Sequence, residues 1–300
     1  METNTLEITE LPEGLGFTSI RALVNQTLNK DFGLNLPAEG IPSGFRELDK
    51  AIGGFKKGQM YTIAVKPGMG KTAFLLSIAN NMAIKDTYSV AIFSSERSNI
   101  KMTNRLIESE TGMSLNRLQS GKFKDSERDH MLSLLSSIAK AKIYIDDTPA
   151  LAVEELRIKA GKLCGLHKVD LIIVDYLELL TTALAGEGDP SVRLAGIMNE
   201  IKAMAQELNT PVILFSQSAG HTNSLIPAGR PSMGAMPAFL REESDVLMVL
   251  HRNDAFPVAG SQQPIGSSVE LIVAKTTEPD REVVVPLHFI ESIAKFADFS

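Results

Sequence analysis

The residue types that bind phosphate gather in one short segment, Val65–Thr72, which reads Val-Lys-Pro-Gly-Met-Gly-Lys-Thr. It follows an apolar run typical of a strand and opens a helical pattern, the setting that a phosphate-binding loop requires. Backbone N–H groups of Gly68 through Thr72 would surround phosphate oxygens at the helix N-terminus. Lys71 would reach the β and γ phosphates, and the Thr72 hydroxyl would ligate Mg²⁺. The predicted nucleotide-binding residues are Lys66, Pro67, Gly68, Met69, Gly70, Lys71, Thr72 and Ala73.

One position of this loop departs from the usual pattern. Val65 stands where such loops carry their first glycine. We therefore expect the tight turn to be made with a β-branched residue, whose backbone is less free than that of glycine. The alternative interpretation of the segment is a glycine-rich turn that binds nothing.

Two carboxylates come directly after apolar runs. Asp175 follows Leu171–Val174, at the carboxyl end of a predicted strand, where open α/β sheets bind ligands. A magnesium–phosphate site needs a carboxylate on a neighbouring strand, so Asp175 is the predicted magnesium residue. Glu96 follows the run Val90–Ser94 and would orient or deprotonate an attacking water. The alternatives are a helix cap or surface acid for Asp175 and a solvated turn residue for Glu96.

Gln217 ends a third apolar run, Pro211–Ser216, in the same way. Its amide could sense a terminal phosphate through a hydrogen bond. A buried structural amide is the alternative interpretation.

Other polar residues are given structural roles. Asp146 and Asp147 also end a predicted strand, but Thr148 and Pro149 follow them, which favours a turn. The histidines His221 and His251 have no Cys, His or carboxylate at metal-ligand spacing, so we predict that neither binds a metal.

Strands and helices must alternate to bring these groups together, and the apolar pattern predicts that order. The near-continuous apolar strands indicate a parallel sheet covered by helices on both faces, in an α/β fold. The predicted strands are Met60–Val65, Val90–Ser94, Ile143–Ile145, Leu171–Val174 and Val212–Phe215. The predicted helices are Ala73–Lys85, Lys101–Thr111, Ser126–Ala139, Val153–Leu163 and Val192–Leu208. An antiparallel extension of the sheet is predicted from Val246–Leu250, Val269–Ala274 and Val283–Phe289, which no helical pattern joins.

The chain is divided by composition into three parts. Residues 1–16 are polar and acidic and are predicted to form a flexible tail. Residues 17–40 combine a short amphipathic helix with a linker rich in Gly and Pro, and residues 41–300 form the main domain. Two loops, Thr181–Ser191 and Ser218–Leu240, exceed the length that a compact fold needs, which marks them as functional or mobile.

Composition narrows the function classes. The formal net charge of −6 argues against a protein that coats nucleic acid by bulk electrostatics, although a local channel could still bind it. No apolar run is long enough to span a bilayer and Met1–Glu10 lacks the features of a signal peptide, so we expect a cytoplasmic protein without membrane partners. The single cysteine, Cys164, lies in an apolar-periodic stretch and is predicted to be buried and unreactive.

Further short motifs occur in a fixed order along the chain: Ile41-Pro42-Ser43-Gly44-Phe45, Leu48-Asp49, Gly53-Gly54, the phosphate loop, Phe93-Ser94-Ser95-Glu96, Tyr144-Ile145-Asp146-Asp147-Thr148-Pro149, Val174-Asp175-Tyr176-Leu177 and Ser216-Gln217. Together they resemble the C-terminal RecA-like ATPase domain of the DnaB-type replicative helicases, over about residues 41–300. Their order and spacing separate the chain from the related RadA and circadian-clock ATPases. The family's N-terminal helical domain, which contacts primase, is expected to be absent.

The resemblance implies a role for each matching residue. Lys71 and Thr72 match the positions for phosphate and magnesium, Glu96 the catalytic base, Asp175 the magnesium-bound water and Gln217 the sensor of the γ-phosphate. The helix near Ser19–Leu28 resembles the family's linker helix, which docks on a neighbouring subunit of a hexameric ring. ATP with Mg²⁺ is the implied cofactor. The implied partners are single-stranded DNA, further copies of this chain, as in a hexamer, and other replication proteins.

Two departures from the family bear on its activity. The family's Lys-x-Arg pair, which reaches into the next subunit's active site, reads Lys275-Thr276-Thr277 here, so the lysine remains and the arginine finger does not. Arg281 could substitute if the turn before it folds back. Of the family's DNA-binding loop only a remnant around Gly234 is visible, and Arg230 is the one cation of the long loop Ser218–Leu240.

These observations leave two functions. The first is an ATP-dependent, DnaB-like helicase or translocase domain that acts on single-stranded DNA as a ring or filament. The second is a nucleotide-dependent regulatory or loading module that assembles with a true helicase. The missing arginine favours the second, whereas the retained Glu96 favours the first, since a binding module needs no base.

Deletion of residues 1–30 is expected to lower the mass of the assembly. The apolar stripe of Ile20, Leu23, Val24 and Leu28 has no large core of its own to join, so it buries its area against another surface. Light scattering at equal chain concentration measures the effect, with deletion of residues 1–16 as the matched control. An unchanged mass would mean that the stripe packs on its own domain.

Overall fold

The computed structural model describes residues 40–120, 125–182, 189–217, 231, 234, 236–252, 268–275 and 278–299. All of them belong to one unit of the chain, Glu39–Ser300. The predicted helix near Ser19–Leu28 lies outside the described residues. Within these residues, no helix combines the length and the apolar character that crossing a bilayer requires.

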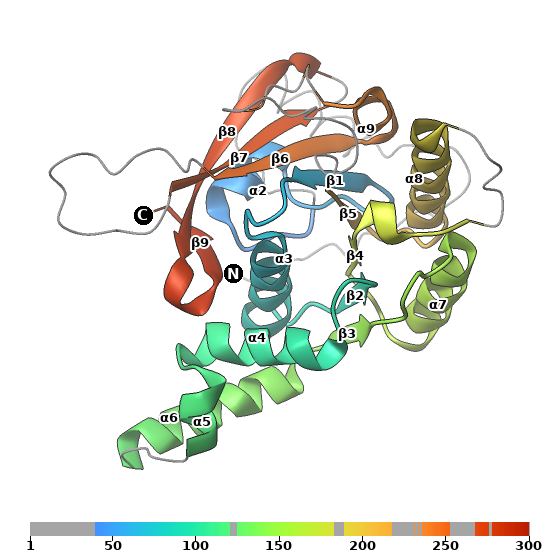
Figure 1. Cartoon of the computed structure of the whole chain (residues 1–300). Helices are drawn as coiled ribbons and strands as arrows, with labels where there is room; N and C mark the ends of the chain where they lie inside the picture. Colours follow the sequence, from blue (N-terminus) through green and yellow to red (C-terminus); the bar gives the residue numbers. More distant parts are fainter. Residues whose placement is uncertain are drawn as a thin grey trace, which may run out of the picture. The chain divides into compact units, whose positions relative to one another are not determined.

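Among the described residues, one nine-stranded sheet forms the centre of the unit, in the order β3-β2-β4-β5-β1-β6-β7-β8-β9 (Figure 1). Neighbours from β3 to β6 in this order are parallel, and neighbours from β6 to β9 are antiparallel. The strands are β1 (Met60–Val65), β2 (Val90–Ser94), β3 (Ile143–Asp146), β4 (Leu171–Asp175), β5 (Val212–Ser216), β6 (Val246–Arg252), β7 (Ser268–Lys275), β8 (Glu278–Ile290) and β9 (Lys295–Asp298).

The central strands are apolar along their whole length because both faces of the sheet are covered. Every residue of β1, β2, β4 and β5 is buried. Side chains alternate between the faces, so Ile63 of β1 joins one hydrophobic cluster and Ala64 joins the other. The sheet therefore lies between two hydrophobic cores, one on each face.

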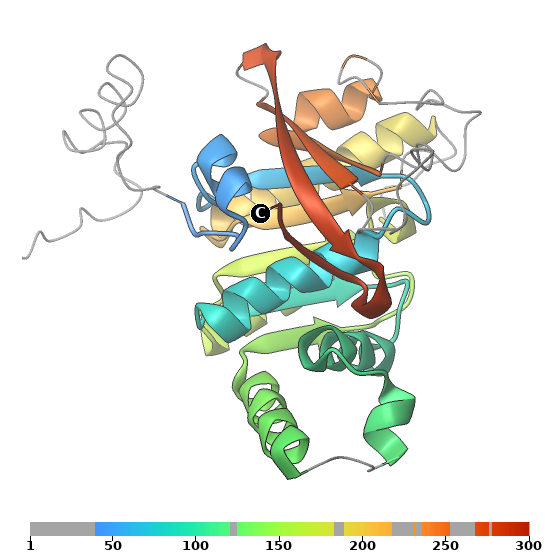
Figure 2. The same ribbon diagram turned by 90° about the vertical axis from the view of Figure 1, so that its left-hand side faces the viewer.

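Helices cover the two faces in two groups (Figure 2). Buried residues of α2, α3 and α4 form one core together with β9, and buried residues of α7, α8 and α9 form the other. The helices are α2 (Arg46–Ile52), α3 (Lys71–Asn80) with the π-helix η1 (Asn81–Lys85), α4 (Asn99–Thr111), α5 (Leu115–Ser120), α6 (Asp125–Lys140), α7 (Val153–Leu166), the 3-10 helix η2 (Leu177–Leu179), α8 (Pro190–Glu207), α9 (Ala238–Glu243) and the 3-10 helix η4 (Glu291–Ile293).

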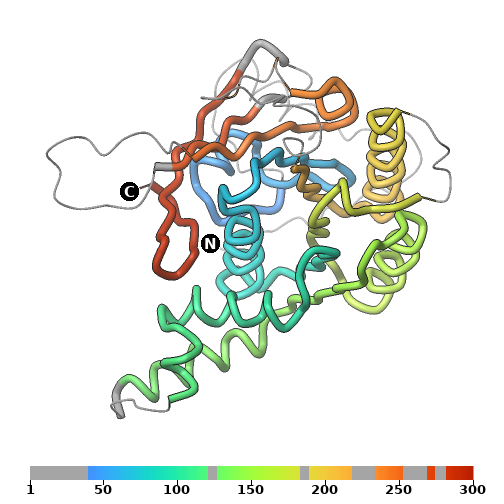
Figure 3. The backbone as a smooth tube through the Cα atoms, viewed as in Figure 1, coloured from blue at the N-terminus to red at the C-terminus, as the bar shows by residue number. Residues whose placement is uncertain are grey.

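The last strand, β9, packs beside α3 (Figure 3). The ring of Phe296 lies edge-on to Phe74 of α3, with 5.3 Å between ring centroids, and 4.7 Å from the ring of Phe289. The backbone N–H of Phe296 donates a hydrogen bond to Ser77 Oγ at 2.9 Å. The strand β9 therefore packs on α3, the helix that follows the glycine loop, and stabilises its position.

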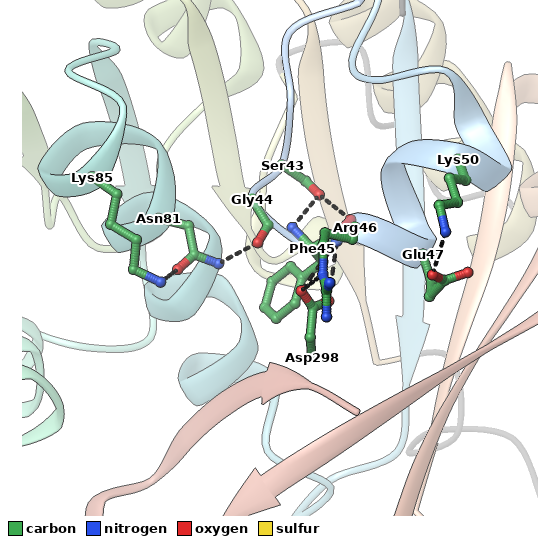
Figure 4. A network of polar contacts seen from close by, with 9 residues as sticks. All are labelled: Ser43, Gly44, Phe45, Arg46, Glu47, Lys50, Asn81, Lys85 and Asp298. Carbon is green, nitrogen blue, oxygen red and sulfur yellow. Dashed lines mark hydrogen bonds and ion pairs between the residues drawn. The ribbon is translucent and has the colours of Figure 1, made fainter. Parts of the chain in front are cut away.

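The start of α2 and the residues before it contact β9 and the first residue of η1 (Figure 4). The Arg46 backbone and guanidinium both donate to the Asp298 carboxylate, at 3.0 and 3.2 Å. Gly44 has a φ of +79°, and a Cβ there would lie 2.4 Å from Cβ of Asn81. Only glycine fits at position 44, where the backbone passes close to Asn81 at the end of α3. The half-buried carboxylate of Asp49, whose pKa burial raises, accepts from the N–H of Ser43 at 2.7 Å.

The structure confirms the α/β fold class, and each predicted element of the main domain is present within a few residues of its predicted bounds. The predicted antiparallel extension is confirmed, and it begins at β6, which pairs in parallel with β1 on one side and antiparallel with β7 on the other. The helices α2, α5 and α9 and the strand β9 were not predicted. They have seven, six, six and four residues, too few to give a clear periodic pattern.

Phe296→Ala is expected to destabilise the folded protein by about 3–5 kcal/mol, because the substitution leaves a cavity between Phe74 and Phe289. Phe296 is 1% exposed. Phe299→Ala is the matched control, since that ring is 52% exposed and its loss should change stability by less than about 0.5 kcal/mol. Urea unfolding of both variants measures the difference, and equal midpoints would contradict the bracing role of Phe296.

Candidate functional site

The glycine loop joins β1 to α3 as the sequence predicted, although its turn is made differently. Val65 is the last residue of β1 and pairs with Leu250, so it takes no part in the turn. The left-handed backbone lies instead at Gly68, with φ +82°, and at Gly70, with φ +94°. The expectation that a β-branched residue makes the turn was therefore wrong, since the two glycines supply the conformations that other residues avoid.

The loop leaves space where a ligand could approach. A Cβ added at Gly68 would meet no atom within 4 Å, whereas one at Gly70 would lie 3.1 Å from the Phe296 ring. Gly70 is the N-cap of α3, and no side chain caps that helix among the described residues. The first N–H groups of α3 have no partner within the helix, so they can bind an anion.

Lys71, the first residue of α3, joins the two predicted carboxylates. Its Nζ donates a short hydrogen bond to Glu96 Oε2 and lies 2.7 Å from Asp175 Oδ1. It also lies 3.7 Å from the centroid of the Tyr176 ring, within reach of a cation–π interaction. Lys71 is 7% exposed and Asp175 1%. The structure thus brings together residues from β1–α3, β2 and β4.

The two oxygens of the Asp175 carboxylate have different neighbours, Ser94 on one side and Lys71 on the other. Its Oδ2 accepts a hydrogen bond from Ser94 Oγ at 3.0 Å. Its buried Oδ1 faces Lys71 as an ion pair but has no hydrogen-bond partner of suitable geometry among the described residues. A buried oxygen without a hydrogen bond fits a carboxylate that receives a metal-bound water. Mg²⁺ keeps several waters and phosphate ligands, so one carboxylate and one hydroxyl would be sufficient protein ligands for it.

The hydroxyl of Thr72 is already occupied by a neighbouring cation. Arg97 Nε donates a hydrogen bond to Thr72 Oγ1 at 3.1 Å. Arg97 Nη2 lies 3.9 Å from Glu96 Oε1. Both side chains follow β2, since Glu96 and Arg97 are consecutive. The predicted magnesium ligand and the predicted base are thus linked through one guanidinium.

Gln217 directly follows β5, and a neighbouring carboxylate fixes its backbone. Glu178, in η2, accepts from the Gln217 N–H at 3.0 Å and from Ser216 Oγ at 2.6 Å. The Gln217 side chain is half-buried. Burial raises the pKa of Tyr176, and the charges of Glu96, Glu178 and Asp175 add to this effect. This edge of the sheet therefore concentrates negative charge around Lys71.

The remaining predicted residues are placed only in part. Gly234 is exposed, and Arg230 lies outside the described residues. Lys275 ends β7 opposite Val246, but its side chain is not described. In the loop, Lys66 and Met69 are half-buried, Pro67 is exposed and Ala73 is buried.

The predicted turn at the end of β3 is confirmed. Asp146 Oδ1 accepts from the Thr148 N–H at 3.0 Å, and Asp147 accepts from the Asn99 N–H at 3.0 Å. Burial raises the pKa of Asp146, but hydrogen bonds from Thr148 and Lys159 outweigh it and lower the pKa below its usual value. His251 is buried in β6, and His221 lies outside the described residues.

Three residues at the site were not predicted: Arg97, Tyr176 and Glu178. Each lies next to, or three residues beyond, a residue that was predicted. Their charge and aromatic character were visible in the sequence, yet adjacent residues after a strand can point in any direction. A search of the two or three positions after each strand end could have found them.

The chain is similar to replicative helicases. A family model described as the DnaB-like helicase C-terminal domain matches residues 40–298. The replicative DNA helicase DnaB of Geobacillus stearothermophilus is 30% identical over 298 residues, which cover 98% of this chain and 64% of that protein. The replicative DNA helicase DnaC of Bacillus subtilis is 29% identical, with 99% and 65% covered. The chain thus spans a little under two thirds of the length of these relatives.

Solved structures give the same result. The ATPase domain of G40P has a TM-score of 0.77 and 25% identity, covering 94% of this chain and 99% of that one. A DnaB-like replicative helicase, described with its interactions with primase, has a TM-score of 0.78 and 26% identity, covering 95% of this chain and 67% of that one. Nearly the whole chain therefore corresponds to one part of a helicase.

Lys71→Met is expected to destabilise the ligand-free protein by about 3 kcal/mol, because it leaves the buried carboxylate of Asp175 without its cation. Lys162→Met is the matched control, since that side chain is exposed on α7 and should change stability by less than about 0.5 kcal/mol. Chemical unfolding without nucleotide measures both. A stability equal to that of the wild type would show that Lys71 does not balance these carboxylates.

Proposed function

Because the chain belongs to the DnaB-like helicase C-terminal domain family, we propose that it is the ATP-driven motor domain of a replicative DNA helicase. The observation that carries the proposal is the position of Lys71 between Glu96 and Asp175 at the start of α3. A loop that only bound phosphate would need neither carboxylate. Hydrolysis needs one to hold the metal-bound water and one to act on the attacking water.

In this proposal the residues Lys66–Ala73 bind the triphosphate of ATP. Thr72 and Asp175 hold Mg²⁺, Thr72 through its hydroxyl and Asp175 through water. The metal would supply positive charge to the phosphate oxygens as the terminal phosphate is transferred. In this proposal Lys71 turns from its carboxylates to the phosphates as ATP binds. Glu96, freed from Lys71, then orients the attacking water and accepts its proton.

Gln217 and Lys275 complete the proposed catalytic set. Glu178 holds the backbone of Gln217 at the end of β5, next to β1 and β4, so its amide is well placed to sense the terminal phosphate. Lys275 ends β7, and in the proposal its ammonium reaches the nucleotide of the next subunit.

We assign the wider setting from the family. The chain acts on single-stranded DNA in the cytoplasm as a homo-hexamer, together with other replication proteins. Residues 41–300 are the ATPase domain, residues 17–40 link neighbouring subunits and residues 1–16 are a tail. Arg230 and Gly234 belong to the loop that faces DNA. Replicative helicases among the relatives, one described with primase, support this setting.

The alternative, a regulatory or loading module without turnover, is not favoured. Its sequence support was the missing arginine at Thr277. Against it, Glu96 stands in direct contact with Lys71 of the phosphate loop, where a base is needed. The relatives named above are replicative helicases and not loading factors.

Glu96→Gln is expected to keep ATP affinity within about twofold and to reduce turnover by about 10²–10⁴, because the amide cannot take a proton from water. Lys71→Ala should instead weaken ATP binding at least about tenfold, since the ammonium stabilises phosphate charge before and during reaction. Equilibrium binding and ATPase rates, each with and without single-stranded DNA, separate the two effects.

Glu207→Gln serves as the control, because Glu207 pairs with Arg157 on the surface, away from the loop. Equal turnover for the wild type and Glu96→Gln would remove Glu96 from the mechanism. A wild-type protein that neither binds nor hydrolyses ATP would contradict the proposed function as a whole.

A further inference from the structure

Arg97 is the one residue of the candidate site whose role neither the loop nor the carboxylates explain. Its Nε donates to Thr72 Oγ1 at 3.1 Å, and its Nη2 lies 3.9 Å from Glu96 Oε1. The side chain is 31% exposed, so it is partly open to solvent. A guanidinium carries five N–H donors, and Nε is the one that bonds here among the described residues. The remaining donors are available to a ligand.

Four charged side chains that contact one another at the loop carry no net charge together. Lys71 and Arg97 carry two positive charges, and Glu96 and Asp175 carry two negative ones. A triphosphate adds several negative charges to this neutral group, and the metal offsets only part of them. Arg97 bonds to the Thr72 hydroxyl and is partly exposed, and no buried ion pair within the described part of the chain holds it. Its displacement would also free Thr72 for the metal.

A second arginine lies close enough to interact with Arg97. Burial lowers the pKa of Arg105 in α4, and the positive charge of Arg97 lowers it further, while Glu108 and Glu96 oppose the change. Like charges that interact in this way favour a nearby anion.

The sequence has no arginine where the family's Lys-x-Arg pair carries one. Residues 275–277 read Lys-Thr-Thr and supply no arginine. An arginine that contacts the terminal phosphate can come from another subunit or from the same chain, and it stabilises the charge that develops during phosphoryl transfer.

We propose that Arg97 is a catalytic residue that binds the terminal phosphate of ATP from within the same chain, moving there from Thr72. The inference rests on the proposed function, because it assumes that the loop binds a triphosphate. It predicts that Arg97 makes the site bind a triphosphate more tightly than a diphosphate. Bond making and breaking are unchanged: water bonds to the terminal phosphorus, the bond to the leaving ADP oxygen breaks, and Glu96 takes the proton.

The test compares Arg97→Ala and Arg97→Lys with the wild-type full chain. The first measurement is the dissociation constant of fluorescent ATP and ADP analogues with Mg²⁺. Arg97→Ala should weaken ATP binding at least about tenfold while changing ADP binding by less than about twofold, because only ATP carries the terminal phosphate. The second measurement is turnover, which should fall at least about 100-fold, near the range for a lost arginine finger. Arg97→Lys should recover part of the affinity but little turnover, since lysine lacks the planar fork.

Two further variants make the result decisive. Arg157→Ala removes a surface arginine that pairs with Glu207 and should change neither measurement. Arg281→Ala tests the other arginine of the sequence that could fill this place. Loss of turnover in Arg281→Ala with wild-type behaviour in Arg97→Ala would assign the role to Arg281 and overturn the proposal.

Other outcomes also overturn it. Equal loss of ATP and ADP binding in Arg97→Ala would mean that Arg97 only supports the loop. Unchanged or tighter ATP binding with normal turnover would mean that Arg97 only occupies the Thr72 hydroxyl until the metal arrives. In both cases a wild type that binds and hydrolyses ATP leaves the proposed function intact, whereas a wild type that binds no ATP overturns both.

Discussion

The ammonium group of Lys71 is the charge on which the candidate site depends. It stands between Glu96 and Asp175, carboxylates that come from two different strands and would otherwise repel one another in a buried place. The parallel pairing of β1, β5, β4 and β2 brings these groups to one edge of the sheet. Lys71 carries one positive charge against the two negative charges of these carboxylates, so its loss would leave them unbalanced.

The sequence predicted the fold well where apolar runs were long. The strands β1, β2, β4 and β5 are buried on both faces, and that requirement leaves a continuous apolar signal that cannot be mistaken for a loop. The strand β9 left no such signal, because it has four residues and only Phe296 is buried. The parallel pairing of β6 with β1 could not be predicted from the apolar pattern, since an apolar strand has the same pattern whichever way its neighbours run.

The site, like the fold, could be predicted from the sequence only in part. Lys71, Glu96 and Asp175 could be placed near one another because strand ends fix the positions of the residues that follow them, and their ion pairs agree with that prediction. Arg97 could not be placed, because its side chain turns back to Thr72 across a gap of 25 residues in the sequence. Such a contact depends on rotamers, which no periodicity encodes. The prediction that Val65 makes the turn of the loop was wrong for a similar reason. The left-handed backbone conformations lie further along the loop, at Gly68 and Gly70.

The contact between β9 and α3 has a consequence for the order in which a newly made chain can mature. Ser77 and Phe296, which share a hydrogen bond, are separated by 219 residues. A chain emerging from the ribosome at about 5–20 residues per second exposes Phe74 and the glycine loop for many seconds before Phe296 can cover them. The helix α3 is among the first parts of the domain to be synthesised, and its packing is among the last to be completed. In a chain that ends before β9, Phe74 therefore lacks one of the rings that it packs against in the finished domain.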